Sequence, residues 1–405
     1  MTTAQDHEGG GADLLGGTRI YLDHAATTPV DPAVIAAMLP YWRAGWGNPS
    51  SLYGAGRAAR AAVDEARAAV AAVLRCAPNE IIFTSGGTEG DNLALKGVVE
   101  AAAAGGRGTH LITTAIEHHA VLHAAEYLER HHGTAVTCLP VDAEGFVDPA
   151  AVEAAIRPDT CLISVMYANN EIGTIQPLAR IGAVARAHGI PFHTDAVQAA
   201  GSLPLDVGAL GVDLLTLAAH KFYGPKGAGV LYVRAGTPLL YQQQGGPQEG
   251  DRRGGTENVA AIVGLAHALE RAEEGRAAYN AHCRALRDRL IGGLLAAIPG
   301  ARLNGPRDDA RSDRLPNNVN VAFPGVEGES LIIALDLLGI AASSGSACTT
   351  GATEPSHVLR AIGVPEKAIA GSLRLTLGRD NTPEQIEEVL AVLPDIIGHL
   401  RDGAW

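Results

Sequence analysis

Between residues 80 and 233, short apolar runs alternate with longer helix-like segments. The apolar runs fall at 80–84, 110–114, 135–139, 160–166, 190–194, 213–218 and 228–233. Helix-like patterns occupy 56–74, 90–104, 118–131, 149–156 and 177–188. Strands that alternate with helices of this length are typical of a mostly parallel sheet covered by helices. The middle of the chain therefore predicts an α/β fold.

After Thr256 the pattern changes. A long helix-like stretch over about 257–298 precedes short strand-like runs near 317–323, 340–343 and 372–377. Further helix-like segments fall near 328–338, 355–362 and 383–401. This succession predicts a second, smaller α+β domain. Residues 1–18, rich in glycine and polar residues, predict a disordered lead.

Lysine is rare in this chain, and its position is informative. Two of the four lysines, Lys221 and Lys226, directly follow the apolar run that ends at Ala219. A partly desolvated amine has a lowered pKa and becomes a nucleophile suited to a Schiff base. A lysine at a strand end that simply reaches solvent is the alternative interpretation.

An acidic residue ends the preceding strand-like run, at Asp195. The spacing to Lys221 leaves room for a connection and a neighbouring strand, so both side chains can lie at one edge of the sheet. A carboxylate facing a lysine Schiff base suits pyridoxal phosphate, because the carboxylate keeps the pyridine nitrogen protonated. A simple ion pair between Asp195 and Lys221 remains an alternative.

A glycine-containing turn supplies a candidate phosphate site. The run 80–85 leads through Gly86, Gly87 and Thr88 into the helix-like segment after Asn92. Glycines allow the backbone to approach an anion closely, and a helix N-terminus offers free N–H groups and the positive end of a dipole. Such a sequence can also be only a turn and a helix cap.

Taken together, these motifs resemble a cysteine desulfurase of the NifS/IscS type, in the class V aminotransferase family of fold-type-I pyridoxal phosphate enzymes. The resemblance runs from about Tyr21 to Asp402. The segments that carry it are Tyr21–Pro29, Gly47–Ser51, Thr84–Glu89, Glu117–His118, Asn169–Gly173, His193–Gln198, His220–Gly227, Arg253–Asn258, Ser343–Cys348 and Ser372–Arg374.

The resemblance implies an organisation in two domains. A large cofactor-binding domain, with a mostly parallel seven-stranded sheet, would span about 31–276. The small domain would take 19–30 together with 277–405 and would carry a catalytic cysteine loop.

The resemblance also assigns roles around the cofactor ring. Lys221 would hold the cofactor as a Schiff base and then remove the α-proton of the substrate. Asp195 would pair with the pyridine nitrogen, Gln198 would bond the ring hydroxyl, and His118 would stack on the ring. A purely structural histidine is the alternative for His118.

Other positions would hold the phosphate and the substrate. The backbone after Gly87, the Thr88 hydroxyl and His220 would bind phosphate, and Thr256 would reach it from the neighbouring subunit of a homodimer. Asn170 and Arg374 would hold the carboxylate of L-cysteine, because guanidinium geometry favours a bidentate contact. No metal is implied.

The five cysteines are odd in number and scattered, and they lack the spacing of a metal site. This pattern suits a protein of the reducing cytoplasm. Cys138 and Cys161 lie in apolar strand-like runs and are expected to be buried and inert. Cys348 lies in a small, polar, glycine-containing segment typical of a mobile loop. By resemblance, Cys348 would take the sulfur of cysteine as a persulfide, leaving alanine. A harmless surface thiol is the alternative.

The family pattern is not matched everywhere. Many members carry a hydroxyl residue where this chain has Ala218, so one phosphate hydrogen bond would be absent unless Thr216 or a water replaces it. The chain stops at Trp405, whereas members that feed an iron–sulfur scaffold often extend further. The sulfur acceptor, an iron–sulfur scaffold or a sulfur carrier, is therefore left open.

Charge and hydropathy narrow the alternatives. A net charge of −13 argues against a nucleic-acid partner, though not against a basic protein. No uncharged apolar run reaches the length of a membrane span, and no signal-peptide pattern opens the chain. The competing functions are a selenocysteine lyase or related aminotransferase, and a non-enzymatic scaffold with the same fold.

Overall fold

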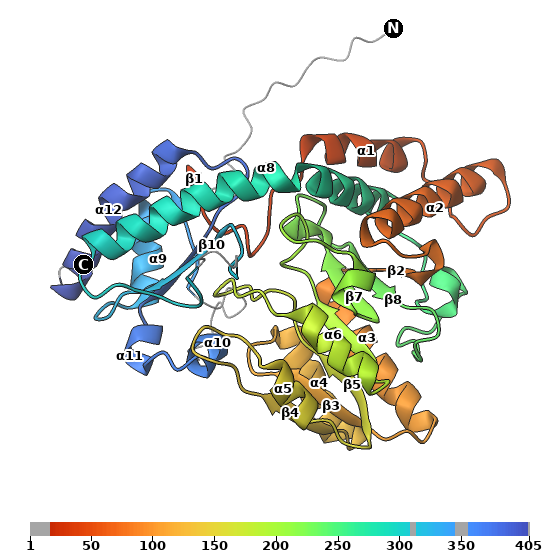
Figure 1. Cartoon of the computed structure of the whole chain (residues 1–405). Helices are drawn as coiled ribbons and strands as arrows, with labels where there is room; N and C mark the ends of the chain where they lie inside the picture. The colour runs from red at the N-terminus through yellow and green to blue at the C-terminus, as the bar shows by residue number, and fades with distance from the viewer. Residues whose placement is uncertain (1–16, 308–312, 345–354, 404–405) are drawn as a thin grey trace, which may run out of the picture.

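A seven-stranded sheet forms the larger part of the molecule (Figure 1). The computed structural model describes residues 17–307, 313–344 and 355–403. The strands of this sheet are, in spatial order, β2 (Ile81–Thr84), β8 (Gly229–Val233), β7 (Leu214–Ala218), β6 (Phe192–Asp195), β5 (Thr160–Ser164), β3 (His110–Thr114) and β4 (Ala135–Leu139). All neighbours are parallel except β8, which runs antiparallel to both β7 and β2. The mostly parallel sheet expected from the alternating pattern is confirmed.

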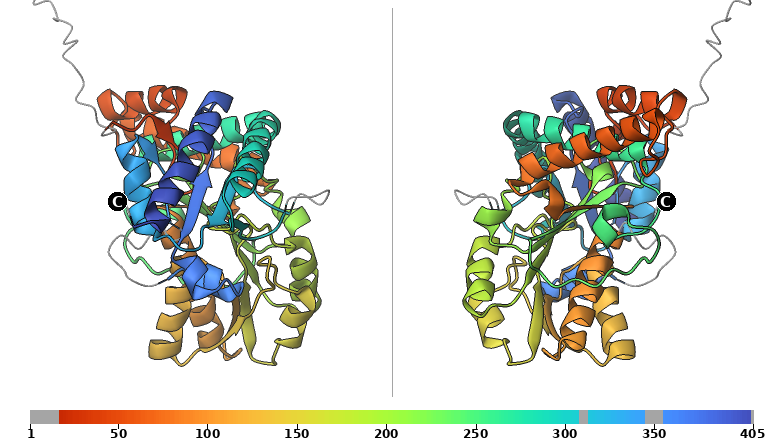
Figure 2. Two further views of the ribbon diagram at one scale, coloured as in Figure 1. Left: turned by 90° about the vertical axis from the view of Figure 1, so that its left-hand side faces the viewer. Right: turned by 90° about the vertical axis from the view of Figure 1, so that its right-hand side faces the viewer.

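Helices cover both faces of this sheet, which lies between two helical layers in Figure 2. One face packs on α3 (Gly87–Ala104) and α4 (His119–His132). The elements of the other side are α1 (Pro32–Arg43), α2 (Gly54–Leu74), α5 (Pro149–Ala154), α6 (Leu178–Ala187), α7 (Val207–Leu210) and the first part of α8 (Val259–Ala297). Alternate strand residues serve the two layers: Leu214 packs with α3 and α4, and Leu215 with the opposite core. Both faces are therefore buried, as parallel sheets require.

A second core lies at the far end of α8. The strands β9 (Arg302–Leu303), β10 (Asn318–Ala322) and β12 (Ser372–Thr376) form an antiparallel sheet, and β1 (Ile20–Tyr21) pairs with β11 (Ile340–Ala341). The helices here are α9 (Gly328–Leu337), α10 (His357–Ala361), α11 (Glu366–Ile369) and α12 (Pro383–Arg401). Apolar residues of α9, α12 and the second part of α8 pack against these strands. The α+β character expected after Thr256 is present.

The described residues also form three short 3₁₀ turns: η1 (Pro78–Glu80), η2 (Ala219–Lys221) and η3 (Gln248–Asp251). None of the described helices is long and apolar enough to span a membrane.

One expectation about the cysteines is wrong. Cys138 is exposed rather than buried, because its strand β4 is the outermost strand of the sheet. Cys161, on the interior strand β5, is buried as expected. Most of the predicted disordered lead, residues 1–16, lies outside the described residues.

Candidate active site

The site lies where two neighbouring parallel strands end. Asp195 is the last residue of β6, and β7 ends three residues before Lys221. Asp195 is paired in register with Thr216 of β7. The carboxyl ends of both strands therefore meet at one edge of the sheet, which brings Asp195 and Lys221 together as the sequence predicted.

Lys221 lies in η2 beneath the segment that follows β1. Its Nζ donates hydrogen bonds to the carbonyl oxygens of Ala25, at 2.5 Å, and Ala26, at 2.8 Å. The same segment is fastened to the lysine turn by Thr28, whose backbone N–H donates to the His220 carbonyl over 2.8 Å. The amine is thus held at the sheet edge by acceptors that do not neutralise its charge.

Asp195 is a buried carboxyl group with one backbone donor. It is only 6 % exposed, and its Oδ1 accepts a hydrogen bond from Val197 N at 2.9 Å. Burial raises its pKa to about 6, while the Val197 N–H and the Lys221 charge oppose this rise. A cationic ring nitrogen in contact with Asp195 would stabilise the carboxylate, which fits a pyridinium partner.

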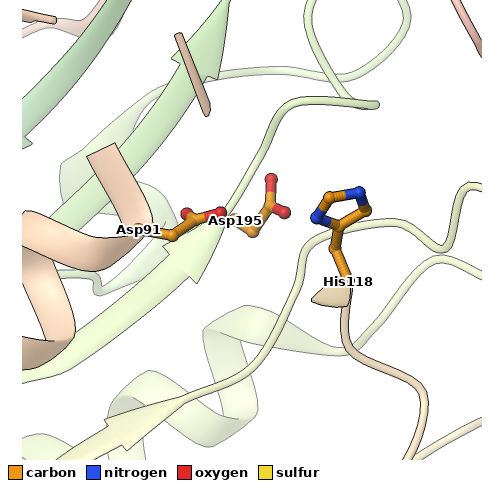
Figure 3. A group of neighbouring side chains, drawn as sticks. All are labelled: Asp91, His118 and Asp195. Atoms are coloured by element: carbon orange, nitrogen blue, oxygen red, sulfur yellow. The ribbon is translucent and has the colours of Figure 1, made fainter. Parts of the chain in front are cut away.

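His118 faces Asp195 from the start of α4. One ligand atom each from His118, Asp195 and Asp91 lies within 4.8 Å of the others (Figure 3). His118 also caps α4, because its Nδ1 accepts a hydrogen bond from Ala120 N. Burial and the Lys221 charge lower its pKa to about 4, so the ring is neutral near pH 7. His118 therefore has a structural role as the cap of α4, and its neutral ring also faces the Asp195 carboxyl group.

The candidate phosphate site is the first turn of α3. The helix begins at Gly87, and Thr88 is exposed there. A Cβ added to Gly87 would come within 2.9 Å of the Val197 Cγ2, so this position requires close backbone approach. His220 contacts Thr27 through Nδ1, and burial lowers its pKa to about 4. Both Gly87 and His220 lie next to segments that carry Asp195 or Lys221.

Thr216 is the candidate to replace the hydroxyl missing at Ala218. Its side chain is fully buried and its Oγ1 lies 3.1 Å from His193 Nε2. That hydroxyl also lies close to α3, 3.2 Å from the position of a Cβ built on Gly90, and it favours the ionised form of Asp91. Whether Thr216 or a water replaces the missing phosphate contact stays a prediction.

Gln198 and Thr256 have different surroundings. Gln198 donates through Nε2 to the Ala25 carbonyl, the same oxygen that Lys221 bonds. Thr256 is exposed, and its side chain makes no hydrogen bond within the described part of the chain. The nearby Arg253 forms an ion pair with Glu89 of α3, at 2.7 Å. The single chain therefore brings Gln198 to the site and leaves Thr256 on the surface.

Arg374 provides a buried cation on the opposite side of the site. It is 1 % exposed, and its Nη2 lies 2.8 Å from Asp23 Oδ1. Its Nη1 donates to the Asn170 carbonyl, and its Nε has no hydrogen-bond partner among the described residues. Arg374 and Asn170 are thus neighbours.

Cys348 lies outside the described residues, but both flanks of its segment are anchored at the site. On the N-terminal side, Ser343 exchanges backbone hydrogen bonds with Arg374. On the other side, Ser356 donates to Glu171 Oε2, and His357 contacts the Glu117 carbonyl through Nε2 at 2.9 Å. The described residues that flank this segment therefore lie beside Arg374 on one side and beside the loops that follow β3 and β5 on the other.

Sequence reasoning missed several acidic residues that shape this site. Glu117 is fully buried, and burial raises its pKa to about 8. Asp23 pairs with Arg374, and Asp91 lies beside Asp195. The motifs that include Asp23 and Glu117 were visible, but nothing in their spacing revealed which partners they would meet.

Comparisons with known proteins agree with this geometry. A family model described as aminotransferase class-V matches residues 20–389. Cysteine desulfurase IscS of Clostridium botulinum (strain Hall) is 50% identical over 384 residues, covering 95% of this chain and 96% of the relative. Cysteine desulfurase IscS of Methanosarcina thermophila is 52% identical over 95% of this chain and 93% of its own. A solved NifS-like protein superimposes with a TM-score of 0.87 at 38% identity, over 94% of this chain and 100% of the other.

Proposed function

Since the chain belongs to the aminotransferase class-V family, in its group of NifS/IscS-type cysteine desulfurases, we propose that it converts L-cysteine to L-alanine and transfers the sulfur as a persulfide on Cys348. The fold is the expected fold-type-I α/β architecture. The observation that carries the proposal is the meeting of Asp195, His118 and Lys221 at one sheet edge, with Arg374 across from them.

Pyridoxal 5′-phosphate is the cofactor that these residues fit. Asp195 offers a buried carboxylate for the pyridine nitrogen, His118 a neutral ring for its face, and Lys221 an amine for its aldehyde carbon. When bound, the cofactor supplies an electron sink that weakens the bonds at the substrate Cα. The first turn of α3, with Gly87 and Thr88, would hold the phosphate.

Lys221 would act twice at the same place. It would hold the cofactor through Nζ, and its amine would also be the base that takes the proton from the substrate Cα. The carbonyls of Ala25 and Ala26 would then hold the amine close to that proton. Gln198 would turn from the Ala25 carbonyl to the ring hydroxyl.

The substrate carboxylate would bind Arg374 and Asn170. A carboxylate of cysteine would meet the guanidinium group of Arg374, which Asp23 holds in place through Nη2. The Asn170 side chain is partly exposed at the same place and would donate to the second oxygen.

Sulfur transfer would be a nucleophilic substitution at sulfur. The Cys348 thiolate attacks the substrate sulfur, and the bond between that sulfur and the substrate Cβ breaks. The sulfur stays on Cys348 as a persulfide, and protonation of the remaining carbon skeleton gives alanine. The persulfide would pass to a protein acceptor, an iron–sulfur scaffold or a sulfur carrier, in the cytoplasm.

A homodimer would complete the phosphate site. Thr256 is exposed in the single chain, which is consistent with a role in the site of a partner. Large apolar side chains are also exposed around the connection between α1 and α2: Trp42, Trp46, Leu52 and Tyr53, with Trp46 77% and Leu52 90% exposed. Apolar surface of this kind is typical of a subunit interface.

The test is the product analysis of the cofactor-loaded protein given L-cysteine and a reducing thiol. We expect alanine and sulfide in equal amounts. A keto acid as the carbon product, with no sulfide, would indicate an aminotransferase instead. A protein that binds no pyridoxal phosphate and shows no Schiff-base absorbance would be a scaffold.

A further inference from the structure

Asp91 is a buried acid that the proposed reaction does not use. It lies in α3 and is 1 % exposed. Its Oδ1 has no hydrogen-bond partner in the described part of the chain, and the nearest basic atom recorded for it, His193 Nε2, is 3.6 Å away. A buried carboxyl oxygen with no donor is costly if it carries charge, so the placement of Asp91 calls for an explanation.

Close packing of α3 on the sheet places Asp91 next to Asp195. A Cβ on Gly90 would come within 2.7 Å of the Thr216 Cγ2, so glycine lets the helix rest directly on β7. Figure 3 shows Asp195 between Asp91 and His118, with the Asp91 carboxyl group directed toward Asp195. Asp91 therefore lies behind the carboxyl group that faces the cofactor site.

The surroundings cannot support two ionised carboxylates at this place. Glu117 adds a third buried acid, at the entry to α4. The nearby groups that can carry positive charge are Lys221 in η2 and the histidines His118 and His193. Burial lowers the pKa of His193 to about 3, and both its nitrogens already face hydroxyls, those of Ser164 and Thr216. Lys221 is thus the one cation available near this cluster of described residues.

The two aspartates differ in what stabilises their charge. Asp195 accepts from Val197 N and lies within reach of the Lys221 charge, and both favour its ionised form. For Asp91, burial raises the pKa well above the usual range, and the charge of Asp195 raises it further; the Thr216 hydroxyl opposes this rise, and the Glu117 charge adds a smaller one. Where two coupled acids share one proton, the proton resides on the acid whose ionised form has fewer stabilising neighbours.

We propose that Asp91 is a positioning residue that stays a neutral carboxylic acid, so that Asp195 is the one ionised member of the pair and its charge is directed at the pyridine nitrogen. This inference rests on the proposed function, since it assigns Asp195 to the cofactor. It adds that α3, which begins at the phosphate site, also sets the charge at the other end of the cofactor ring.

The first test uses the apoprotein and the pH dependence of its stability. An acid whose pKa is higher in the folded state than in the unfolded state contributes stability below the unfolded pKa, and this contribution is lost as pH rises toward the folded pKa. Asp91→Asn cannot ionise and escapes the loss. Between pH 5 and pH 7 the unfolding constant of the wild type should therefore rise relative to that of Asp91→Asn, by up to about tenfold per pH unit.

The matched control is Asp64→Asn, on the exposed surface of α2. Its unfolding constant should keep a constant ratio to that of the wild type over the same range. A constant ratio for Asp91→Asn as well would mean that Asp91 is ionised in the folded protein, and the proposal would be wrong.

The second test measures the dissociation constant of pyridoxal phosphate from the apoprotein variants. Asp91→Asn, which imitates the neutral acid, should bind within about threefold of the wild type. Asp91→Ala, which leaves a cavity behind Asp195 and no longer supports that carboxyl group, should bind about tenfold more weakly. If Asp91→Asn binds as weakly as Asp91→Ala, a charged Asp91 is required and the inference fails.

Asp195→Asn separates this failure from a failure of the proposed function. It should weaken cofactor binding more than either Asp91 variant. If Asp195→Asn binds normally, the cofactor site itself is misassigned. If only the Asp91 variants depart from expectation, the function stands and the inference falls. Should Asp91→Ala fail to fold, the stability profile of Asp91→Asn still decides.

Discussion

Lys221 depends on a segment that lies 196 residues earlier in the sequence. Its amine is bonded to the carbonyls of Ala25 and Ala26, and the same Ala25 oxygen accepts from Gln198. Carbonyl oxygens hold an amine without fixing its proton, which suits a group that must form a covalent bond and later carry a proton. The end of β7 therefore sets the position of Lys221, and the carbonyls of Ala25 and Ala26 set the direction of its amine.

Replacing Lys221 by alanine should abolish the covalent link to the cofactor. No second lysine is positioned to substitute, because Lys226 follows the turn at Gly224 and Pro225. Turnover of cysteine should fall by at least about 10³-fold, since both the link and the base are lost. Borohydride reduction of the wild type followed by peptide mapping checks the assignment, and a pyridoxyl label on another lysine would contradict it.

Only some of the site residues could be predicted from the sequence. Asp195 and Lys221 were accessible because each follows an apolar run, and the ends of neighbouring parallel strands meet. Asp91 and Asp23 were not accessible, because their roles depend on contacts across the fold: Asp91 on how closely α3 packs, and Asp23 on an ion pair with Arg374. The surroundings of the Thr216 hydroxyl could not be predicted either, because they depend on His193 from the neighbouring strand.

The helices and strands that could be predicted from the sequence were those whose apolar residues form a regular pattern, because that pattern marks the face they bury. Most strands of the large sheet were found because they are short apolar runs, and β6 (Phe192–Asp195) because it follows Ile190 and Pro191 and ends in an acid. Helix α1 was missed although Asp31 and Pro32 give a cap and a first-turn proline. The strands β1, β9 and β11 have two residues each, and such short pairings are set by tertiary contacts that no local pattern reveals.

Helix α8 connects the two cores of the molecule. Its first turns, around Leu265, pack on the large sheet, and its last turns, around Leu290, pack on the small one. Figure 1 shows it running from beside α12 to beside α1 and α2. We propose that the domain boundary lies within this helix, with a large domain over 31–276 and a small domain made of 19–30 and 277–405.

The whole molecule is predicted to be a dimer with shared sites. Light scattering should give twice the 41.7 kDa mass of the chain. Thr256→Ala should remain dimeric and bind pyridoxal phosphate about 10- to 100-fold more weakly, as expected for the loss of a hydrogen bond to a charged group. A stable monomer that retains the cofactor would contradict this organisation.

Mixed dimers test whether Thr256 acts across the interface. A dimer of one Lys221→Ala chain and one Thr256→Ala chain contains a site with Lys221 from one subunit and Thr256 from the other. That site should bind the cofactor with wild-type affinity if Thr256 acts in the partner. Binding no better than in the Thr256→Ala homodimer would show that Thr256 serves its own subunit.

The measurement that tests the central claim most directly compares the wild type with Cys348→Ser, given L-cysteine. The variant keeps Lys221, Asp195 and Arg374, so it should bind the cofactor and show a spectral change when cysteine is added. A serine hydroxyl at neutral pH is not a sulfur nucleophile. Mass spectrometry should therefore find one added sulfur on Cys348 of the wild type, and the variant should form almost no alanine. Alanine formation by Cys348→Ser at the wild-type rate would contradict the account.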